Sequence, residues 1–471
     1  MEKIRDFIKE HKIFAVIALA AVFVHLLVFF YLLQLSAAHP SAVNGSFPMI
    51  GGGGDSTDYV NLAENMLRYH NFSLIPGSGS NPETFRTPAY PFFVAAVILF
   101  TGGIKAVPIF QIVLLVLCGF LVYKTALAFS SKYKAVGLIA AGLFMFDPAL
   151  FFTTQFVTTE SIYTFLLLIS VYFLISRSYP QKIGYIISGI SFGLSVLTRP
   201  SGILLLVPLA IFMLWNLCHS KEKGSYLLNS VYMIAALFLV VSPWIIRNGV
   251  RTGVYKIASV DSYNAINFNV PQYFNYRYGT PIEGVRSSLH AQIGGLSDLE
   301  QRDIKNSAII KAVVWNKMRG HLLDYAVFHV SKSFNFFFSS GLKFDLNFLS
   351  SFYEDSPSNL VWHPEKSLVN SVLGGNMRQA LGLFKENAIY IPESVFLLLV
   401  FILGLYWTIS MRSRSASLFF GLIVMLALVT GQLSNPRYRI PVIPFMYITA
   451  AAGAMEMLAR RRTGNWLADK R

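Results

Sequence analysis

The stretch IFAVIALAAVFVHLLVFFYLLQL occupies residues 13–35, and His25 is its only basic or acidic side chain. A run of about 20 predominantly apolar residues is long enough to cross a bilayer as a helix. It is too long for the apolar core of a secretory signal, and Ser36-Ala37-Ala38 is a weak cleavage site. We therefore expect a retained first membrane-spanning helix, preceded on its cytoplasmic side by Lys3, Arg5, Lys9 and Lys12.

The composition of the whole chain agrees with this first helix. Hydrophobic residues make up 54% of the 471 residues, charged residues make up 13%, and the mean hydropathy is +0.52. Soluble proteins carry about 25% charged residues, so an ordinary soluble domain is excluded. We expect an all-α integral membrane protein with about ten or more spans, at residues 13–35, 105–129, 134–147, 160–176, 184–197, 202–217, 227–246, 391–410, 415–433 and 440–459.

The basic residues of the short loops give an orientation. They fall in alternate loops, as Lys132 and Lys134, Arg177 and Lys182, Lys221 and Lys223, Arg412 and Arg414, and Arg460–Arg462. Lys and Arg accumulate on the cytoplasmic side, so both termini are expected to be cytoplasmic, in the inner or plasma membrane of the cell. This scheme requires the short apolar run 91–100 to lie on the outer membrane surface, because counting it as a span would invert the following loops.

The scheme divides the chain into three parts. Residues 1–246 form an N-terminal transmembrane module that includes the external loop 36–104 and would hold the catalytic site. Residues 247–390 form a small mixed extracytoplasmic domain, in which the amphipathic stretches 304–315 and 322–338 predict juxtamembrane helices. Residues 391–471 supply the last transmembrane helices and a basic cytoplasmic tail.

Three acidic residues fall on the predicted outer side. Asp55 follows the glycine run 51–54 and, with Asp58, opens a helix predicted over 57–69. Glu160 opens a span at its outer end. Each acid has an ordinary explanation as a helix cap or first-turn residue. A carboxylate at the edge of the hydrocarbon is nevertheless a candidate functional group, and Asp55 and Glu160 are expected to face one external cavity.

Five arginines lie on the same side, against the cytoplasmic preference of basic residues. They adjoin apolar runs and prolines, where burial of a guanidinium requires an anionic partner: Arg86, Arg199, Arg247, Arg437 and Arg439. Some can pair with the acids above, and others can hold a phosphate through the guanidinium fork. An acid that deprotonates a hydroxyl, together with arginines that hold phosphate, suits sugar transfer from a lipid phosphate.

Other classes of function lack their usual signals. The histidines show no metal-ligand spacing, Cys118 and Cys218 lie within or at the end of apolar runs, and no phosphate-binding glycine loop opens a βαβ unit. The net charge of +15 lies largely beside apolar segments, which favours anionic membrane lipids or phosphate-bearing substrates as partners rather than nucleic acid.

The ordered motifs resemble those of the GT-C glycosyltransferase superfamily, particularly its bacterial branch near protein O-mannosyltransferases and aminoarabinose lipid A transferases. The resemblance rests on Gly54-Asp-Ser-Thr-Asp-Tyr59, Phe85-Arg-Thr-Pro-Ala-Tyr-Pro91, Thr158-Thr-Glu-Ser161, Leu197-Thr-Arg-Pro200, Pro243-Trp-Ile-Ile-Arg-Asn248 and Arg437-Tyr-Arg-Ile-Pro441. It covers most of the chain, and residues 250–390 match least well.

The resemblance implies a GT-C-type bundle that transfers a sugar from a polyprenyl-phosphate donor to a lipid, glycan or protein hydroxyl, with inversion, on the extracytoplasmic face. By position, Asp55 would be the general base and Glu160 the second catalytic acid. The substrate-binding positions would be Asp58, Tyr59, Arg86, Arg199, Arg247, Arg437 and Arg439. No cofactor or obligatory metal is expected, although the resemblance leaves a divalent metal open because related enzymes differ in metal use.

Two other classes of function stay open. A transporter or flippase of lipid-linked glycans would share the anionic lipid and the many helices, but its polar groups would be expected near the membrane midplane in paired repeats. A non-catalytic membrane assembly subunit would use Asp55 and Glu160 as caps and the arginines as anchors. The acids at one face and the absence of paired halves favour the glycosyltransferase.

Overall fold

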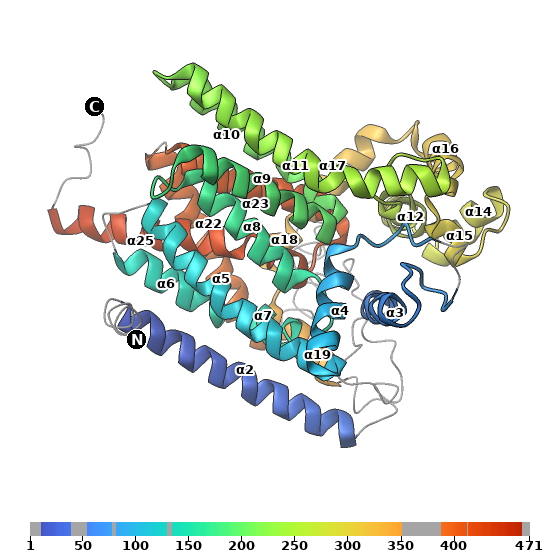
Figure 1. Ribbon diagram of the computed structural model, residues 1–471, viewed down its shortest axis with the longest axis horizontal. Helices are drawn as coiled ribbons and strands as arrows, with labels where there is room; N and C mark the ends of the chain where they lie inside the picture. Colours follow the sequence, from blue (N-terminus) through green and yellow to red (C-terminus); the bar gives the residue numbers. More distant parts are fainter. Residues whose placement is uncertain are drawn as a thin grey trace.

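The computed structural model describes residues 11–38, 54–77, 82–129, 134–350, 388–411 and 413–463. All regular structure in these residues is helical, and none of them forms a strand. Figure 1 shows a bundle of long helices with a cluster of shorter helices at one end. The expected all-α class is therefore confirmed for the described residues.

The long helices coincide with the predicted spans. Their bounds are α2 (Lys12–Ala38), α5 (Val107–Phe129), α6 (Lys134–Met145), α8 (Glu160–Ile175), α9 (Gln181–Thr198), α10 (Leu206–His219), α11 (Lys223–Thr252), α22 (Ile391–Met411), α23 (Arg414–Thr430) and α25 (Ile443–Thr463). Short 3-10 turns extend four of them, namely η2 (Ile104–Ala106), η3 (Pro200–Leu205), η8 (Ala388–Tyr390) and η9 (Gly431–Leu433).

Six of these units are long and apolar enough to cross a membrane. They contain α2, α5, α10, α11, α22 and α23, with their adjoining 3-10 turns. Helices α6 and α8 are apolar but shorter than a full span. The count of ten spans therefore remains a prediction for α6, α8, α9 and α25.

The bundle has one large apolar core. Helix α9 packs between α8 and α11, α5 packs between α6 and α8, and α25 packs against α6 and α22. Small residues let α9 and α11 approach closely: a Cβ at Gly189 would lie 2.2 Å from the carbonyl oxygen of Met233, and one at Gly193 would lie 2.9 Å from Val240. Close approach through small residues is typical of helices packed inside membranes.

The outer surface of the bundle is apolar. On α2, the exposed side chains include Val16, Leu19, Phe23 and Leu27, each at least half exposed. They recur at spacings of three and four residues, so they form one stripe along the helix. A stripe of large apolar side chains on the outside of a bundle is what contact with lipid requires.

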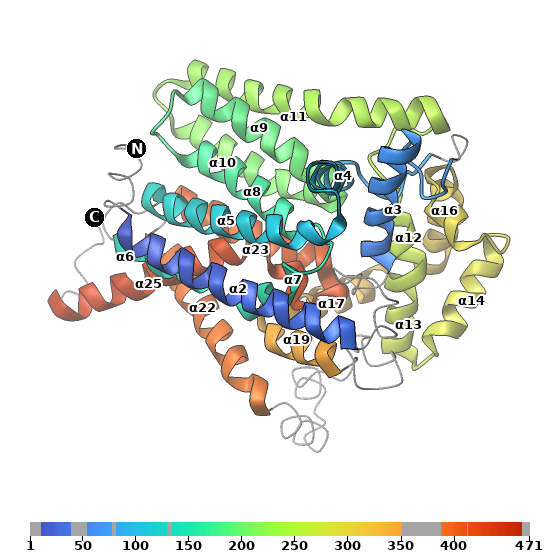
Figure 2. The same cartoon turned by 60° about the horizontal axis from the view of Figure 1, so that its bottom comes forward.

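Shorter helices follow α11 in the chain, and those up to residue 333 form a cluster with its own core. Their bounds are α12 (Val260–Asn264), the π-helical turn η4 (Ala265–Asn269), α13 (Val270–Tyr278), α14 (Ile282–Gln292), α15 (Asp298–Arg302), η5 (Ile304–Asn306), α16 (Ser307–Met318), α17 (Leu322–Ser333), α18 (Asn335–Phe338) and α19 (Gly341–Ser350). Tyr273, Leu289 and Ile310 are the centre of this core. Helix α11 reaches from the bundle into the cluster, so the boundary expected after residue 246 falls inside one continuous helix (Figure 2).

Two helices between α2 and α5 pack on each other next to this cluster. Helix α3 (Gly54–Tyr69) and α4 (Ala89–Thr101) share a core with Tyr59 and Tyr90 at its centre. Helix α4 contains the run 91–100, for which an interfacial position was expected, and ends at Gly102, whose φ is +78°. A second small core joins α2, the short helix α7 (Pro148–Thr153) and α19.

The two ends of the bundle differ. The start of α2 and the end of α25 lie at one end, and the cluster from α12 to α16 lies at the other (Figures 1 and 2). The connection from α10 to α11, which carries Lys221 and Lys223, is at the same end as the start of α2. This arrangement agrees with the expected topology, whose assignment to the two sides of a membrane stays a prediction.

Candidate active site

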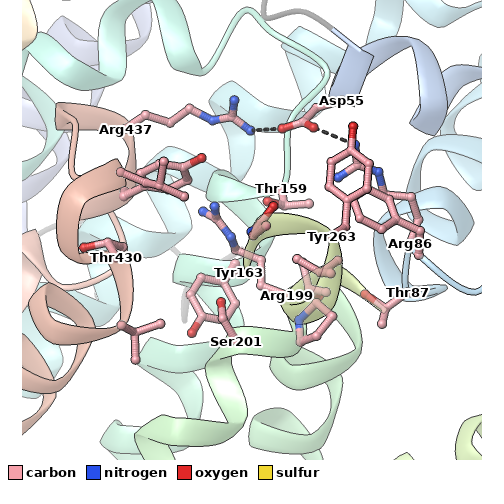
Figure 3. A pocket seen from close by; sticks show the side chains of 18 of the residues that line it. Asp55, Arg86, Thr87, Thr159, Tyr163, Arg199, Ser201, Tyr263, Thr430 and Arg437 are labelled. Carbon is pink, nitrogen blue, oxygen red and sulfur yellow. Dashed lines mark hydrogen bonds and ion pairs between the residues drawn. The ribbon is translucent and has the colours of Figure 1, made fainter. Parts of the chain in front are cut away.

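A cavity of about 430 Å³ opens at the end of the bundle that carries the short helices. One wall comes from α23, η9 and α24 (Pro436–Arg439) and presents Leu426, Val429 and Leu433 beside Arg437. The opposite wall comes from α12 and η4. Figure 3 shows Thr430 and Arg437 on one side, Tyr263 and Arg86 on the other, and Asp55 between them.

Asp55 is the only carboxylate that lines this cavity among the residues that the structure describes. Its Oδ1 accepts a hydrogen bond from Nη2 of Arg86 at 2.6 Å, and its Oδ2 accepts one from Nη2 of Arg437 at 3.3 Å. About a third of its side chain, 34%, is exposed. The described helix α3 starts at Gly54, earlier than the expected residue 57, so Asp55 lies in its first turn, where an acid is favourable.

The surroundings keep Asp55 ionised. Burial raises the pKa of its carboxyl, but Arg86 and Arg437 lower it further than burial raises it, so the pKa falls from 3.8 to about 2. A carboxylate has about four lone-pair positions, and two arginines use only part of them. Asp55 can therefore accept another hydrogen bond from a hydroxyl in the cavity.

Glu160 lies directly behind the cavity wall. It is the first residue of α8, and none of its surface is exposed. Its Oε1 accepts hydrogen bonds from Nε of Arg437 at 2.6 Å and from Nη1 of Arg199 at 2.9 Å. A buried carboxylate needs such partners to offset its lost hydration. Glu160 thus fixes two guanidinium groups that both line the cavity.

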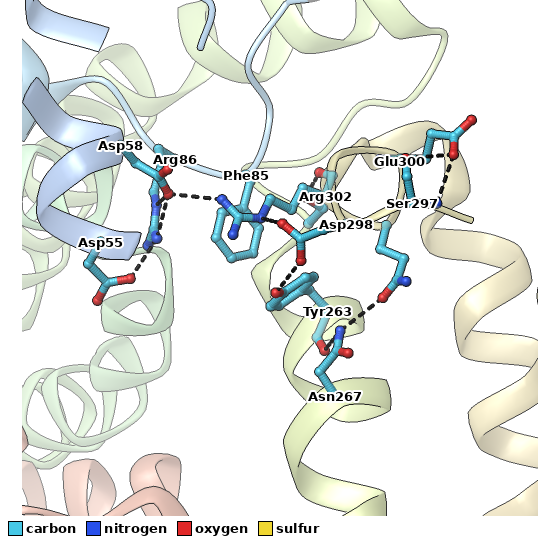
Figure 4. A network of polar contacts seen from close by, with 12 residues as sticks. Asp55, Asp58, Phe85, Arg86, Tyr263, Asn267, Ser297, Asp298, Glu300 and Arg302 are labelled. Carbon is cyan, nitrogen blue, oxygen red and sulfur yellow. Dashed lines mark hydrogen bonds and ion pairs between the residues drawn. The ribbon is translucent and has the colours of Figure 1, made fainter. Parts of the chain in front are cut away.

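Asp58 plays a similar part on the other side of α3. Its Oδ2 accepts hydrogen bonds from Arg86 Nε and Nη2, at 2.9 and 2.8 Å, and from Arg302 Nη1 at 3.0 Å. Arg302 also pairs with Asp298, 2.8 Å away (Figure 4). The result is an alternating row of ions across the site: Asp298, Arg302, Asp58, Arg86, Asp55, Arg437, Glu160 and Arg199.

Tyr59 and the loop before α4 position Arg86. The guanidinium carbon of Arg86 lies 5.2 Å from the ring centre of Tyr59 and 4.6 Å from that of Phe85. Glu83 accepts the backbone N–H groups of Phe85 and Arg86 at 2.5 and 2.9 Å. Tyr59 is largely buried but lines the cavity, as Arg86 does. The backbone at Arg86 is therefore held by Glu83, and its guanidinium group is held by the neighbouring rings.

Two of the arginines expected at the phosphate do not line the cavity. Arg247 donates to the carbonyl oxygen of Glu83 at 2.6 Å and lies 4.6 Å from the ring of Trp244. Arg439 has no exposed surface and donates to the carbonyl oxygens of Phe336 and Ser339, at 2.9 and 3.0 Å. Both guanidinium groups hold backbone segments together next to the site, and a direct role of either in substrate binding stays a prediction.

The described residues do not offer a ready metal site. They contain no group of three or more His, Cys, Asp or Glu side chains arranged to hold a metal ion. Each carboxylate at the cavity already faces two guanidinium groups, since Asp55, Asp58 and Glu160 all pair twice. A divalent cation there would have to displace cations of the protein itself, so these residues do not fit one.

Three cavity residues were not expected from the sequence. Arg302 follows a capping box at Ser297 and looks there like an ordinary surface residue of a short helix. Tyr263 lies outside the sequence motifs described above. Tyr163 follows Glu160 by three residues, and its buried hydroxyl has no hydrogen-bond partner among the described residues. Only the spacing of Tyr163 from Glu160, which puts both on one helix face, could have indicated its position.

The comparisons with known proteins agree with the ordered motifs. Residues 85–246 match the family described as dolichyl-phosphate-mannose-protein mannosyltransferase. This part contains Arg86, Glu160 and Arg199, whereas Asp55, Arg302 and Arg437 lie outside it. A search of curated proteins found no match.

Comparison with solved structures shows which known fold this chain shares. The archaeal oligosaccharyltransferase AglB from Archaeoglobus fulgidus, in complex with an inhibitory peptide and a dolichol-phosphate, matches with a TM-score of 0.50 and 16% identity over 98% of this chain and 53% of that chain. The Archaeoglobus fulgidus oligosaccharyltransferase in complex with Zn and sulfate matches with a TM-score of 0.50 and 14% identity over 95% and 50%. The chain thus spans about half the length of these oligosaccharyltransferase chains.

A further structure, ArnT from Cupriavidus metallidurans bound to undecaprenyl phosphate, matches at 10% identity and a TM-score of 0.36 over 93% of this chain and 81% of that chain. The resemblance to the GT-C superfamily, stated above from the motifs, is confirmed by the family match and by the shared oligosaccharyltransferase fold. At this coarse level, residues 85–246 resemble a glycosyltransferase family, and the fold resembles that of a solved oligosaccharyltransferase.

Proposed function

We propose that this protein is an inverting glycosyltransferase that moves a sugar from a polyprenyl-phosphate donor to an acceptor hydroxyl on the extracytoplasmic side of the membrane. The observation that carries the proposal is the composition of the cavity. One carboxylate, Asp55, lines it together with four guanidinium groups, those of Arg86, Arg199, Arg302 and Arg437, and one wall carries several apolar side chains. This combination suits a substrate with a phosphate, a polar transferable group and a lipid tail.

The reaction is a single displacement in which Asp55 is the general base. The oxygen of the acceptor hydroxyl attacks the anomeric carbon of the donor sugar, and the hydroxyl proton passes to Asp55. The bond between the anomeric carbon and the phosphate oxygen breaks, and its electron pair stays on the phosphate. A displacement from the opposite face inverts the anomeric carbon.

Arg437 and Arg199 are placed to stabilise the leaving phosphate. Both line the cavity, and both are held from behind by Glu160. Fixed cations aimed at developing negative charge lower the barrier without reorganisation during the reaction. Glu160 has no exposed surface, so its proposed role is to position these two arginines rather than to contact the substrate.

The loose contact between Arg437 and Asp55 couples donor binding to the base. At 3.3 Å it is longer than the 2.6 Å contact of Arg437 with Glu160. A bound phosphate would compete with Asp55 for this guanidinium. Loss of the Arg437 charge from Asp55 raises the pKa of its carboxyl, which makes Asp55 a better base only when the donor is present.

The apolar wall indicates the orientation in which the donor would bind. Leu426, Val429 and Leu433 continue into α23, which is a candidate membrane span. A polyprenyl chain lying along this wall would bring its phosphate to Arg437 and Arg199. The opposite wall, formed by α12 and η4, would then contact the acceptor.

The direct test compares Asp55→Asn with the wild type in lipid, using radiolabelled polyprenyl-phosphate monosaccharides and membrane extract as the acceptor source. We expect Asp55→Asn to lose transfer but to keep donor binding, because the amide cannot take a proton. Asp324→Asn is the matched control, since Asp324 is 56% exposed and lies outside the cavity lining. Full transfer by folded Asp55→Asn would remove Asp55 as the base.

A further inference from the structure

We infer that the wall formed by α12, η4 and Arg302 is a binding subsite for a neutral sugar residue, so that the acceptor is an uncharged glycan. The inference rests on the proposed function and names its acceptor class. Three features of the wall carry it: its aromatic faces, its internally compensated charge, and a π-helical turn fixed from both sides.

The wall offers aromatic surface of the kind that packs against a sugar ring. Tyr263 and Phe268 line the cavity with their ring centres 6.2 Å apart, and Phe85 lies 4.9 Å from Tyr263. A pyranose has apolar C–H faces and a polar rim of hydroxyls. Aromatic side chains bury the faces, and a few convergent polar groups orient the rim.

The polar groups of this wall suit hydroxyls. The amide of Asn264 lines the cavity and can donate and accept at once, as a sugar hydroxyl also can. Thr87 adds a hydroxyl group on the same side (Figure 3). The Tyr263 oxygen can accept a hydrogen bond there, since its proton is donated to Asp298. Arg86 adjoins them and holds Asp55, so a hydroxyl bound on this wall lies on the Arg86 side of the base.

The charge of the wall argues against an anionic acceptor. Arg302 is its cation, and it pairs with two carboxylates, Asp58 at 3.0 Å and Asp298 at 2.8 Å. On the donor side, the two guanidinium groups of Arg199 and Arg437 share the carboxylate of Glu160. Arg437 also contacts Asp55 at 3.3 Å, but Asp55 is shared with Arg86. The surplus positive charge therefore lies on the donor side, and the acceptor wall has none to offer a phosphate or an acidic sugar.

Arg302 instead stiffens the wall. Its guanidinium carbon lies 5.1 Å from the ring centre of Phe85 and 5.4 Å from that of Tyr263. The hydroxyl of Tyr263 donates to Asp298 at 2.6 Å (Figure 4). Because the guanidinium lies against both rings and both of its partners are in place, the aromatic faces keep one spacing with or without a ligand.

The π-helical turn η4 directly follows α12, which carries Tyr263 and Asn264, and itself contributes Phe268 to the cavity. Asn267 within it donates to Gln301 at 3.0 Å, and its Oδ1 lies 2.9 Å from Nε2 of His290. The side-chain oxygen of Asn269 accepts a hydrogen bond from Gln432 at 3.1 Å. This bond joins the turn to η9, in the opposite wall of the cavity where the donor is proposed to bind. Single π-turns cost helix stability and are frequent at functional sites. Here the π-turn is held by hydrogen bonds to α14 and α15 on one side and to η9 on the other.

The test offers three acceptor probes to the wild type with a labelled polyprenyl-phosphate sugar: a neutral alkyl hexoside, the same hexoside bearing a phosphate, and a peptide with Ser and Thr. We expect transfer to the neutral hexoside in preference to the other two. Phe268→Ala and Asn264→Ala should each raise the KM for the hexoside about tenfold or more. They should leave the Kd for polyprenyl phosphate unchanged, as should the control Leu299→Ala, which should also keep the KM.

The outcomes separate the two proposals. Preferred transfer to the phosphorylated hexoside or to the peptide would overturn the neutral-glycan subsite and leave the glycosyltransferase standing. An unchanged hexoside KM in folded Phe268→Ala and Asn264→Ala would also overturn it. Absence of transfer to every acceptor, including membrane extract, would instead overturn the proposed function and the subsite with it.

Discussion

Arg437 touches two carboxylates at once, Glu160 through Nε and Asp55 through Nη2. Its guanidinium is therefore already oriented before a substrate arrives. In the proposed reaction it binds the donor phosphate, while Glu160 keeps it from moving with the leaving group. Removal of this side chain should act mainly on the donor.

Arg437→Ala should weaken the binding of polyprenyl phosphate about 10- to 100-fold, since a hydrogen bond to a charged group contributes roughly 1.5–3 kcal/mol. Titration of the purified protein in lipid nanodiscs with polyprenyl phosphate measures this. Arg277→Ala is the control, because Arg277 is 55% exposed and lies outside the cavity lining. The same Kd in folded Arg437→Ala and wild type would exclude Arg437 from the donor site.

The pKa of Asp55 makes a prediction for the pH dependence of transfer. In the free protein this pKa is about 2, so the stabilising ion pair is complete above 3.8 and is lost as the pH falls toward 2. In the donor complex the pKa should be higher, because Arg437 then faces the phosphate. The acid limb of kcat should therefore lie at higher pH than that of kcat/KM for the donor. Coincident limbs would contradict the coupling of Arg437 to Asp55.

Much of the cluster of acids and arginines at the cavity could be predicted from the sequence, one residue at a time. Acids and arginines placed on the outer side beside apolar runs had to find partners, and Asp55, Arg86, Arg199 and Arg437 do meet at one cavity. The sequence could not show that Arg247 and Arg439 donate to backbone carbonyls, because a guanidinium satisfied by a carbonyl and one facing a cavity look alike in sequence. Arg302 was missed because its partner Asp58 is far away in the chain.

At the scale of elements, α9 and α11 pack closely on each other, with Arg199 directly after the end of α9 and Arg247 in the last turns of α11. Gly189 lies where the helices come closest, with the Met233 carbonyl oxygen 2.2 Å from an ideal Cβ. The neighbour is backbone rather than a flexible side chain. An added methyl group must therefore separate the helices.

Gly189→Ala should destabilise the protein by about 1–3 kcal/mol, the usual cost of an overpacked interior. Thermal unfolding in detergent measures the loss as a lower midpoint. Gly224→Ala is the matched control, because its Cβ would meet nothing within 4 Å near the start of the same α11, and alanine favours a helix. Equal midpoints for the two variants would contradict the close packing of α9 on α11.

The elements themselves were predicted unevenly. Apolar runs indicated the long helices, because every residue of such a run favours burial or lipid contact. The π-helical turn between α12 and α13 could not be predicted, since the hydrogen bonds of Asn267 and Asn269 to distant elements hold it. The π-turn also contributes Phe268 to the acceptor wall.

At the scale of the whole molecule, the helices α12 to α16 occupy one end of the bundle, and the start of α2 and the end of α25 occupy the other (Figure 2). The cavity is lined by residues of α12 and so lies toward the first of these ends. The basic loops predict that the second end is cytoplasmic. The proposed reaction then takes place outside the cytoplasm. This orientation rests on charge distribution and is open to direct test.

In a Cys218→Ser background, a cysteine introduced at Ser287 on α14 should react with an impermeant thiol reagent in intact cells. One introduced at Ser178, between α8 and α9, should not react until the cells are opened. Both positions are exposed, so access to the reagent depends on the side of the membrane. Labelling of Ser178→Cys alone in intact cells would reverse the orientation.

The most direct measurement follows a polyprenyl-phosphate sugar with the reconstituted wild type and Asp55→Asn, and determines by NMR both the release of polyprenyl phosphate and the anomeric configuration of the product. Sugar transfer with inversion by the wild type, absent from a folded Asp55→Asn protein that still binds the donor, is the predicted result. Movement of intact donor between leaflets by both proteins, without release of polyprenyl phosphate, would contradict the glycosyltransferase and favour a transporter.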